Sequence, residues 1–245
     1  KWCIEDIDYK LKKFAFALFY CMEIIDSIFR LMHSKRFYNI NYKPKIGEAT
    51  YDEIGNPKFT RYIKASLRKR YIAFDVETTG LNPYKGDRIF EVAAVLFIDG
   101  KPVKYFSSLV YPKRFIPWEA SRVNGISNML IWLAPSEDVV YRNLIEFIEE
   151  SLNGNTIICA YNADFHFDFL YEAFGRFKYK ADIKCIDTLY LARKYIRNTE
   201  NYKLGTIMEY YGFKFNTHCA LDDALGCGKV LWAILEDLDK KEQAQ

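Results

Sequence analysis

The amino-acid sequence predicts an α/β fold, in which a mixed five-stranded sheet has helices on both faces and is preceded by a helical extension. Residues 71–76 form a short and almost wholly apolar run, which predicts a strand buried on both faces. Two strand-like segments follow, with Asp99 and Gly100 between them, a pair typical of β-hairpin turns. From residue 136 onward, helical and strand-like patterns alternate, so we expect further strands to join the sheet through helical connections.

The remaining elements follow from local patterns. The expected strands cover residues 71–76, 88–98, 103–110, 156–161 and 183–186. Pro112 and Pro117 break the strand pattern, and two short helical pieces are expected within residues 121–135. Ser136 and the acidic residues after it predict the start of a helix that ends near Leu152. The other expected helices cover residues 165–174, 187–195, 204–211 and 220–235. The main domain is therefore expected at 71–238, with a tail at 239–245.

Residues 1–33 are predicted to form one long amphipathic helix. Apolar side chains recur at alternating spacings of three and four, the pattern of a heptad repeat. They are Ile4, Ile7, Leu11, Phe14, Leu18, Cys21, Ile25, Ile28 and Met32. Such a face must be buried, either on the rest of the chain, on a second copy in a homodimer, or on a protein partner.

Residues 34–70 are predicted to be a connector rich in basic and aromatic residues. Between Ser34 and Tyr71 there are ten Lys or Arg and three Asp or Glu, interleaved with Phe and Tyr. Cations attract phosphates and aromatic rings stack on bases, so this composition suits nucleic acid as a partner. A solvated charged surface is the alternative interpretation.

Composition narrows the class of protein. Of the 245 residues 50% are hydrophobic, which excludes a disordered chain, and the net charge is +3. The six cysteines show no C-x-x-C spacing, so we expect reduced thiols in a cytoplasmic protein. The longest uninterrupted apolar run near the N-terminus, residues 14–22, is shorter than the roughly 20 residues that span a bilayer. We therefore expect no membrane association.

Two carboxylates interrupt the apolar run of the first strand. Asp75 and Glu77 are two positions apart, so on a strand both side chains project from the same face, and Gly80 then permits a sharp turn. Like charges on a buried strand are costly unless a cation lies between them. Oxygen ligands of this kind favour a hard divalent cation, Mg²⁺ or Mn²⁺. Solvated carboxylates at a strand end are the alternative.

A second candidate segment precedes the last helix. His218 lies in the loop before that helix, and Asp223 lies in its first turn. A short loop followed by a helix can direct an imidazole and a carboxylate to one point, which suits a base beside a metal. An ordinary exposed loop histidine is the alternative for His218.

Three ordered segments resemble the motifs of the DEDDh-type 3'-5' exonucleases. They are FDVETTGL at 74–81, AYNADFHFDFL at 160–170, and the pair of His218 and Asp223. The family includes the proofreading exonucleases of bacterial replicative polymerases, and its fold is ribonuclease H-like. The resemblance covers about residues 70–238 and extends to the Val123–Ser127 turn.

The resemblance implies a site that uses two divalent ions. Asp75, Glu77 and Asp223 would hold the ions, with Asp75 shared between them, and His218 would take a proton from the attacking water. Further residues would contact the 3'-terminal nucleotide, with Leu81 against its base. These are Thr78, Thr79, Leu81, Asn162 and Phe165.

The chain departs from the family pattern in the middle motif. Where the family has the fourth metal-binding aspartate, this sequence has His166, with Asp164 and Asp168 two positions away on either side. Three interpretations remain open: His166 impairs the site, Asp168 is the ligand through a remodelled loop, or His166 itself binds the metal. Two positions on a helix turn a side chain by about 200°, which disfavours a neighbour as a direct substitute. Imidazole is a poor Mg²⁺ ligand, so a working His166 site would favour Mn²⁺.

The sequence therefore predicts a metal-dependent 3'-5' exonuclease that acts on single-stranded DNA or RNA ends. The alternative is an exonuclease-fold module that binds 3' ends and hydrolyses them weakly because of His166. A role of the N-terminal helix in assembling a larger complex is compatible with both. The sequence leaves open DNA or RNA as substrate, and proofreading, repair, RNA processing or defence as role.

Overall fold

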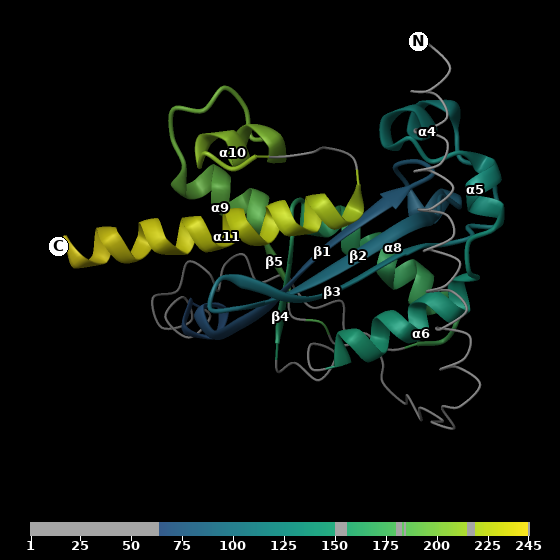
Figure 1. Ribbon diagram of the computed structural model, residues 1–245, viewed down its shortest axis with the longest axis horizontal. Coiled ribbons are helices and arrows are strands. Elements are labelled where there is room, and N and C mark those ends of the chain that lie inside the picture. The colour runs from purple at the N-terminus through teal and green to yellow at the C-terminus, as the bar shows by residue number, and fades with distance from the viewer. Residues whose placement is uncertain (1–63, 150–155, 180–182, 184, 215–218, 245) are drawn as a thin grey trace, which may run out of the picture. The chain divides into compact units, whose positions relative to one another are not determined.

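The computed structural model describes residues 64–149, 156–179, 183, 185–214 and 219–244 (Figure 1). The predicted helix at 1–33, the part of the predicted connector (34–70) up to residue 63, and His218 lie outside the described residues. They therefore remain predictions.

A mixed five-stranded sheet forms the centre of the described domain. Its strands are β1 (Arg70–Thr78), β2 (Ile89–Ile98), β3 (Lys101–Leu109), β4 (Ile157–Ala160) and β5 (Cys185–Asp187). Their order in the sheet is β3-β2-β1-β4-β5. The β1–β2 and β2–β3 pairs are antiparallel, whereas β1–β4 and β4–β5 are parallel. This arrangement confirms the predicted fold class.

Helices surround the sheet in the described part of the chain (Figure 1). They are η1 (Pro83–Lys85), α4 (Trp118–Asn124), α5 (Asn128–Trp132), α6 (Glu137–Phe147), α8 (Ala163–Arg176), α9 (Thr188–Tyr195), α10 (Leu204–Tyr210) and α11 (Ala220–Gln243). Residues 64–69 are also helical. No described helix has the length and apolar composition required to cross a membrane.

The β2–β3 turn has the conformation that its sequence predicts. Asp99 and Gly100 both have positive φ, 49° and 73°, as a tight hairpin turn requires. Gly100 also packs directly against the ring of Trp232 on α11, where a Cβ atom would clash. The glycine is therefore needed both for the turn and for the close approach of α11.

Side chains alternate along β1 between two hydrophobic clusters. Ile72, Phe74 and Val76 pack with residues of α6 and α8 on one face of the sheet. Tyr71 and Ala73 pack with residues of α9, α10 and α11 on the other face. Successive side chains of a strand point to opposite faces, so the odd-numbered positions after Ala73 also belong to the α11 face. This register decides where the acidic residues of β1 lie.

Helix α11 is longer than the sequence predicts. It ends at Gln243 rather than Leu235, so most of the expected tail is helical. The extra turns are stabilised by contacts with residues 64–69: Lys64 pairs with Asp239 at 2.6 Å and with Glu242 at 2.8 Å. The described end of the expected connector is thus a helix packed on the domain. Periodicity within either segment alone does not reveal this pairing.

Candidate active site

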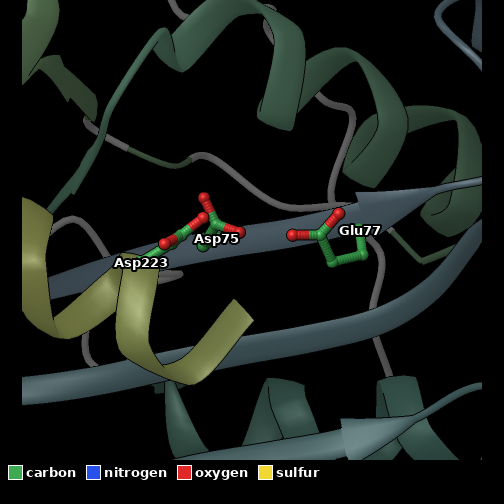
Figure 2. Close-up of side chains that lie close together, drawn as sticks. All are labelled: Asp75, Glu77 and Asp223. Atoms are coloured by element: carbon green, nitrogen blue, oxygen red, sulfur yellow. The ribbon is translucent and has the colours of Figure 1, made fainter. Parts of the chain in front are cut away.

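Three carboxylates from distant parts of the chain converge on the α11 face of the sheet. Asp75 and Glu77 lie on β1, and Asp223 lies in the first turn of α11. One ligand oxygen of each lies within 4.8 Å of the others. Figure 2 shows the three side chains turned toward one another. The sequence predicted all three as metal ligands, and the structure brings them together.

The electrostatics of this group favour a bound cation. Asp75 is only 6% exposed, and burial raises its pKa well above the usual range, with Asp223 and Glu77 raising it further. Burial, followed by Glu91 and Asp223, raises the pKa of Glu77 to about 7. Three carboxylates this close repel one another unless positive charge lies between them. Oxygen donors alone make up the group, which fits Mg²⁺ or Mn²⁺.

Asn124 connects α4 to this group. Its Nδ2 donates a hydrogen bond of 2.8 Å to Oε2 of Glu77, and this bond opposes the rise in the pKa of Glu77. Helix α4 ends there because Gly125 follows with φ of 69°. The sequence drew attention to this turn but assigned no role to Asn124, because the contact joins residues 47 positions apart.

Glu91 is a buried carboxylate beside this group that the sequence analysis missed. It is the Cα partner of Glu77 across the β1–β2 pair. Its oxygens accept from the backbone N–H of Ala220 at 3.4 Å and from the Cys219 thiol at 3.7 Å, so Glu91 anchors the start of α11. An acidic residue inside the otherwise apolar β2 run was the available signal.

Both ring nitrogens of His166 are engaged by backbone groups. Nδ1 accepts from the N–H of Val76 at 3.2 Å, so the proton of the neutral ring lies on Nε2. Nε2 is 3.1 Å from the carbonyl oxygen of Tyr161, to which it donates, and 3.5 Å from Oδ1 of Asp75. Burial lowers the pKa of His166 to about 4, so the ring is neutral. This geometry leaves no nitrogen lone pair for a metal and argues against His166 as a ligand.

Asp168 does not lie with the carboxylate group. Its carboxylate hydrogen-bonds the hydroxyl of Tyr84 on η1, and the pKa of Tyr84 is raised by burial and then by Asp168. Among the described residues, the group with metal-ligand spacing contains Asp75, Glu77 and Asp223 only. The expectation that Asp168 is a ligand therefore has no support in the geometry, because helix α8 turns it away from His166.

The residues expected to contact the terminal nucleotide differ in exposure. Leu81 is 84% exposed and free to make contacts. Thr79 is buried, and its hydroxyl accepts from the N–H of Arg88 at 3.0 Å, so it closes the end of the β1–β2 pair. The hydroxyl of Thr78 donates to the carbonyl of Gly80 at 2.7 Å. Of these side chains, Leu81 is the one directed to solvent.

The other two expected contact residues lie at the start of α8. Asn162 has a left-handed backbone with φ of 74°, and its N–H donates to Oδ1 of Asp187 at 3.1 Å. The ring of Phe165 stands edge-on to His166, with centroids 5.3 Å apart. Both residues belong to the middle motif, and their contact with a nucleotide remains a prediction.

The family profile described as Exonuclease matches residues 72–231. The chain belongs to the exonuclease family. This confirms the resemblance found in the sequence, and the matched region spans β1 to α11.

Two kinds of relative resemble this exonuclease domain. It is 29% identical over 187 residues to a PolC-type DNA polymerase III of Caldanaerobacter subterraneus, covering 76% of this chain and 13% of the relative. It is also 29% identical over 187 residues to the DNA polymerase III subunit epsilon of Aquifex aeolicus, covering 75% of this chain and 89% of the relative. The chain thus spans a small part of the PolC-type relatives.

Solved structures support the fold of the exonuclease domain. Exonuclease X in complex with 5' overhanging duplex DNA is 26% identical, with a TM-score of 0.51, covering 69% of this chain and 91% of that one. The nuclease domain of 3'hExo, a DEDDh family member bound to rAMP, is 19% identical, with a TM-score of 0.60, covering 69% of this chain and 93% of that one. The second likeness bears on the fold alone.

Ionisation of Glu77 is expected to destabilise the metal-free exonuclease domain as pH rises. The pKa of Glu77 is about 7 in the folded state, whereas the same side chain in the unfolded chain has a pKa of 4.5. A raised folded-state pKa contributes stability that is complete below 4.5 and is lost as pH rises through about 7. Thermal unfolding in EDTA, followed from pH 5 to pH 8 by circular dichroism, measures this loss, and Glu77→Gln is expected to reduce the slope.

Added Mg²⁺ or Mn²⁺ is expected to reverse the loss at pH 8. A cation that binds only the folded state stabilises it by about 2.7 kcal/mol at 100 times its Kd. His166, whose pKa burial lowers to about 4, contributes in the opposite direction between pH 5 and its unfolded value of 6.5, so the comparison with the variant isolates Glu77. The explanation fails if Glu77→Gln has the same slope as the unmodified chain.

Proposed function

We propose that this domain is a metal-dependent 3'-5' exonuclease that releases mononucleotides from single-stranded nucleic-acid ends. The observation that carries the proposal is the group formed by Asp75, Glu77 and Asp223, with ligand oxygens within 4.8 Å, on the fold of this family. When bound, divalent ions stabilise negative charge on the entering and leaving oxygens of the phosphodiester.

The chain's own residues divide the remaining work. Asp75, Glu77 and Asp223 would hold two ions, Mg²⁺ or Mn²⁺. His218 takes the proton from the attacking water, since a neutral imidazole is a competent base near pH 7. Leu81 contacts the base of the 3'-terminal nucleotide, because it is exposed just beyond the end of β1.

His166 favours a second candidate function. It occupies the position of the fourth family carboxylate, and its nitrogens are committed to Val76 and Tyr161. A site with three carboxylates holds a second ion less firmly, so the domain would bind 3' ends and hydrolyse them slowly. Two measurements distinguish an efficient exonuclease from a binding module that hydrolyses slowly. They are the rate of hydrolysis in Mn²⁺ and the change in that rate caused by His166→Asp.

The test uses single-stranded DNA and RNA oligonucleotides labelled at the 5' end, incubated with Mg²⁺ or Mn²⁺. The expected result is a ladder of products that shortens from the 3' end and disappears with His218→Ala. Cleavage by His166→Asp but not by the unmodified chain would establish an impaired exonuclease. Absence of cleavage by both would reject hydrolysis and leave the binding function.

A further inference from the structure

The segment that carries α4 and α5 exposes an unusual amount of apolar surface. Helix α4 buries none of its residues, and α5 buries only Ile131. The large apolar side chains exposed along this segment are Phe115, Trp118, Val123, Met129, Leu130, Trp132 and Leu133. Apolar side chains gathered in this way usually mark an interaction site.

The exposed segment is nevertheless held in a defined conformation. Ile116 is buried, and its backbone N–H and carbonyl both bond to the side chain of Asn128, at 2.7 Å and 3.0 Å. Ser127 caps α5 by accepting from the N–H of Leu130 at 3.2 Å. The hydroxyl of Ser121 donates to the carbonyl of Ile126 at 2.6 Å. The surface is therefore built and held in place without a partner.

The segment adjoins the carboxylate group. Asn124, the last residue of α4, donates to Glu77, which contributes one oxygen to that group. The Oδ1 atom of Asn124 is buried and accepts no hydrogen bond within the described structure. A strand whose 3' end lies at the carboxylates therefore has its terminal nucleotide next to the end of α4.

A hollow of about 390 Å³ opens on α4, lined by Ile116, Trp118, Ser121, Arg122 and Asn128. This volume lies within the roughly 300–1,000 Å³ of sites that hold small organic groups. The Trp118 ring is 65% exposed, and the Arg122 guanidinium lies over it, 5.5 Å from the ring centroid. The hollow is therefore lined by an exposed aromatic ring that has a cation over one of its faces.

Charge on the segment suits a polyanion. Between residues 113 and 133 there are three cations and one carboxylate. The cations are Lys113, Arg114 and Arg122, and the carboxylate is Glu119. Arg114 is partly neutralised, because it lies 3.2 Å from Asp87. Arg122 is left close to the aromatic ring, where a phosphate and a base of the same nucleotide could both be contacted.

We propose that Trp118 and Arg122 form a stacking platform for the nucleotides that precede the 3'-terminal one. This inference rests on the proposed function for the position of the 3' end. The occupant is a single strand, because the bases of a duplex are already stacked and paired and their faces cannot lie on a protein ring. The affinity of the protein for a single strand should therefore increase when the strand extends beyond its 3'-terminal nucleotide.

The test compares Trp118→Ala with Trp132→Ala in the full chain. Trp132 is a matched control because it is also mostly exposed and lies on α5, outside the hollow. Binding of 5'-labelled oligothymidylates of two and eight nucleotides is measured by fluorescence anisotropy in EDTA, where no divalent ion supports hydrolysis. Stacking on one ring is worth about 1–3 kcal/mol per base, so the eight-nucleotide strand should bind roughly tenfold more weakly to Trp118→Ala.

Three results decide the inference. It is supported if the unmodified chain and Trp132→Ala both favour the longer strand and Trp118→Ala loses that preference. It is overturned if both variants bind the eight-nucleotide strand with equal affinity. It is also overturned if the chain self-associates without nucleic acid and Trp118→Ala abolishes this self-association, because the surface would then bind a second copy of the chain. Hydrolysis is measured separately in Mg²⁺ and Mn²⁺, so absence of cleavage together with a Trp118 effect would reject the exonuclease activity alone.

Discussion

Asp75→Asn is expected to lower hydrolysis of single-stranded oligonucleotides by roughly 10³-fold, since loss of one electrostatic stabiliser at a reaction centre costs about 10²–10³. The same change is expected to raise the thermal midpoint of the metal-free domain. Asp75 is 6% exposed and lies beside Glu77 and Asp223, so an uncharged amide removes repulsion and the cost of burying a charge. Each kcal/mol recovered adds about 2–4 °C.

The two measurements on Asp75→Asn are made on the same protein preparation. Exonuclease rate is followed with a labelled oligonucleotide in Mg²⁺ and Mn²⁺, and the midpoint by calorimetry in EDTA. Asp222→Asn is the matched control, because Asp222 is the neighbour of Asp223 on α11 but does not belong to the carboxylate group. A loss of activity accompanied by a lower midpoint would show that Asp75 supports the fold and would remove the argument for a cation site.

His166→Asp is expected to raise hydrolysis by roughly 10–100-fold, with the larger gain in Mg²⁺, because it adds a fourth oxygen ligand beside Asp75. Without metal the variant is expected to be less stable than the unmodified chain. It removes the bonds that His166 makes to Val76 and Tyr161, and it adds a fourth negative charge to a buried group. Titration calorimetry with Mn²⁺ should show a higher number of bound ions.

His166→Asn is the control for this prediction. Asparagine has the shape of aspartate without its charge, so it also loses the histidine bonds but adds no anionic ligand. Equal rates for the two variants would mean that the carboxylate is not the cause of the gain. Equal ion stoichiometry in His166→Asp and the unmodified chain would contradict the three-carboxylate description of the site.

Local patterns predicted the framework of the domain and the three residues of its carboxylate group. The apolar run before Asp75, the Asp99–Gly100 turn and the acidic start of α11 are short-range signals, and each corresponds to an observed element. Strand alternation alone was sufficient to place Asp75 and Glu77 on one face.

The features that the sequence did not predict depend on contacts between distant residues. The role of Glu91 follows from its pairing with β1 and its bond to Ala220, 129 positions away. The last turns of α11 form ion pairs with Lys64, which lies far away in the sequence. The commitment of His166 to Val76 joins two motifs 90 positions apart. None of these contacts can be predicted from the spacing of apolar and polar residues along the sequence.

The alternation along β1 also limits how this domain can change during evolution. Even positions fill the hydrophobic cluster beneath the sheet, and odd positions end in the carboxylates above it. Deleting one residue between Tyr71 and Phe74 would exchange the two sets, placing Asp75 among aromatic rings and an apolar side chain among the acids. Point substitutions can change the carboxylates of β1 one at a time. An insertion or deletion in this strand would instead disrupt the hydrophobic core and the carboxylate group together.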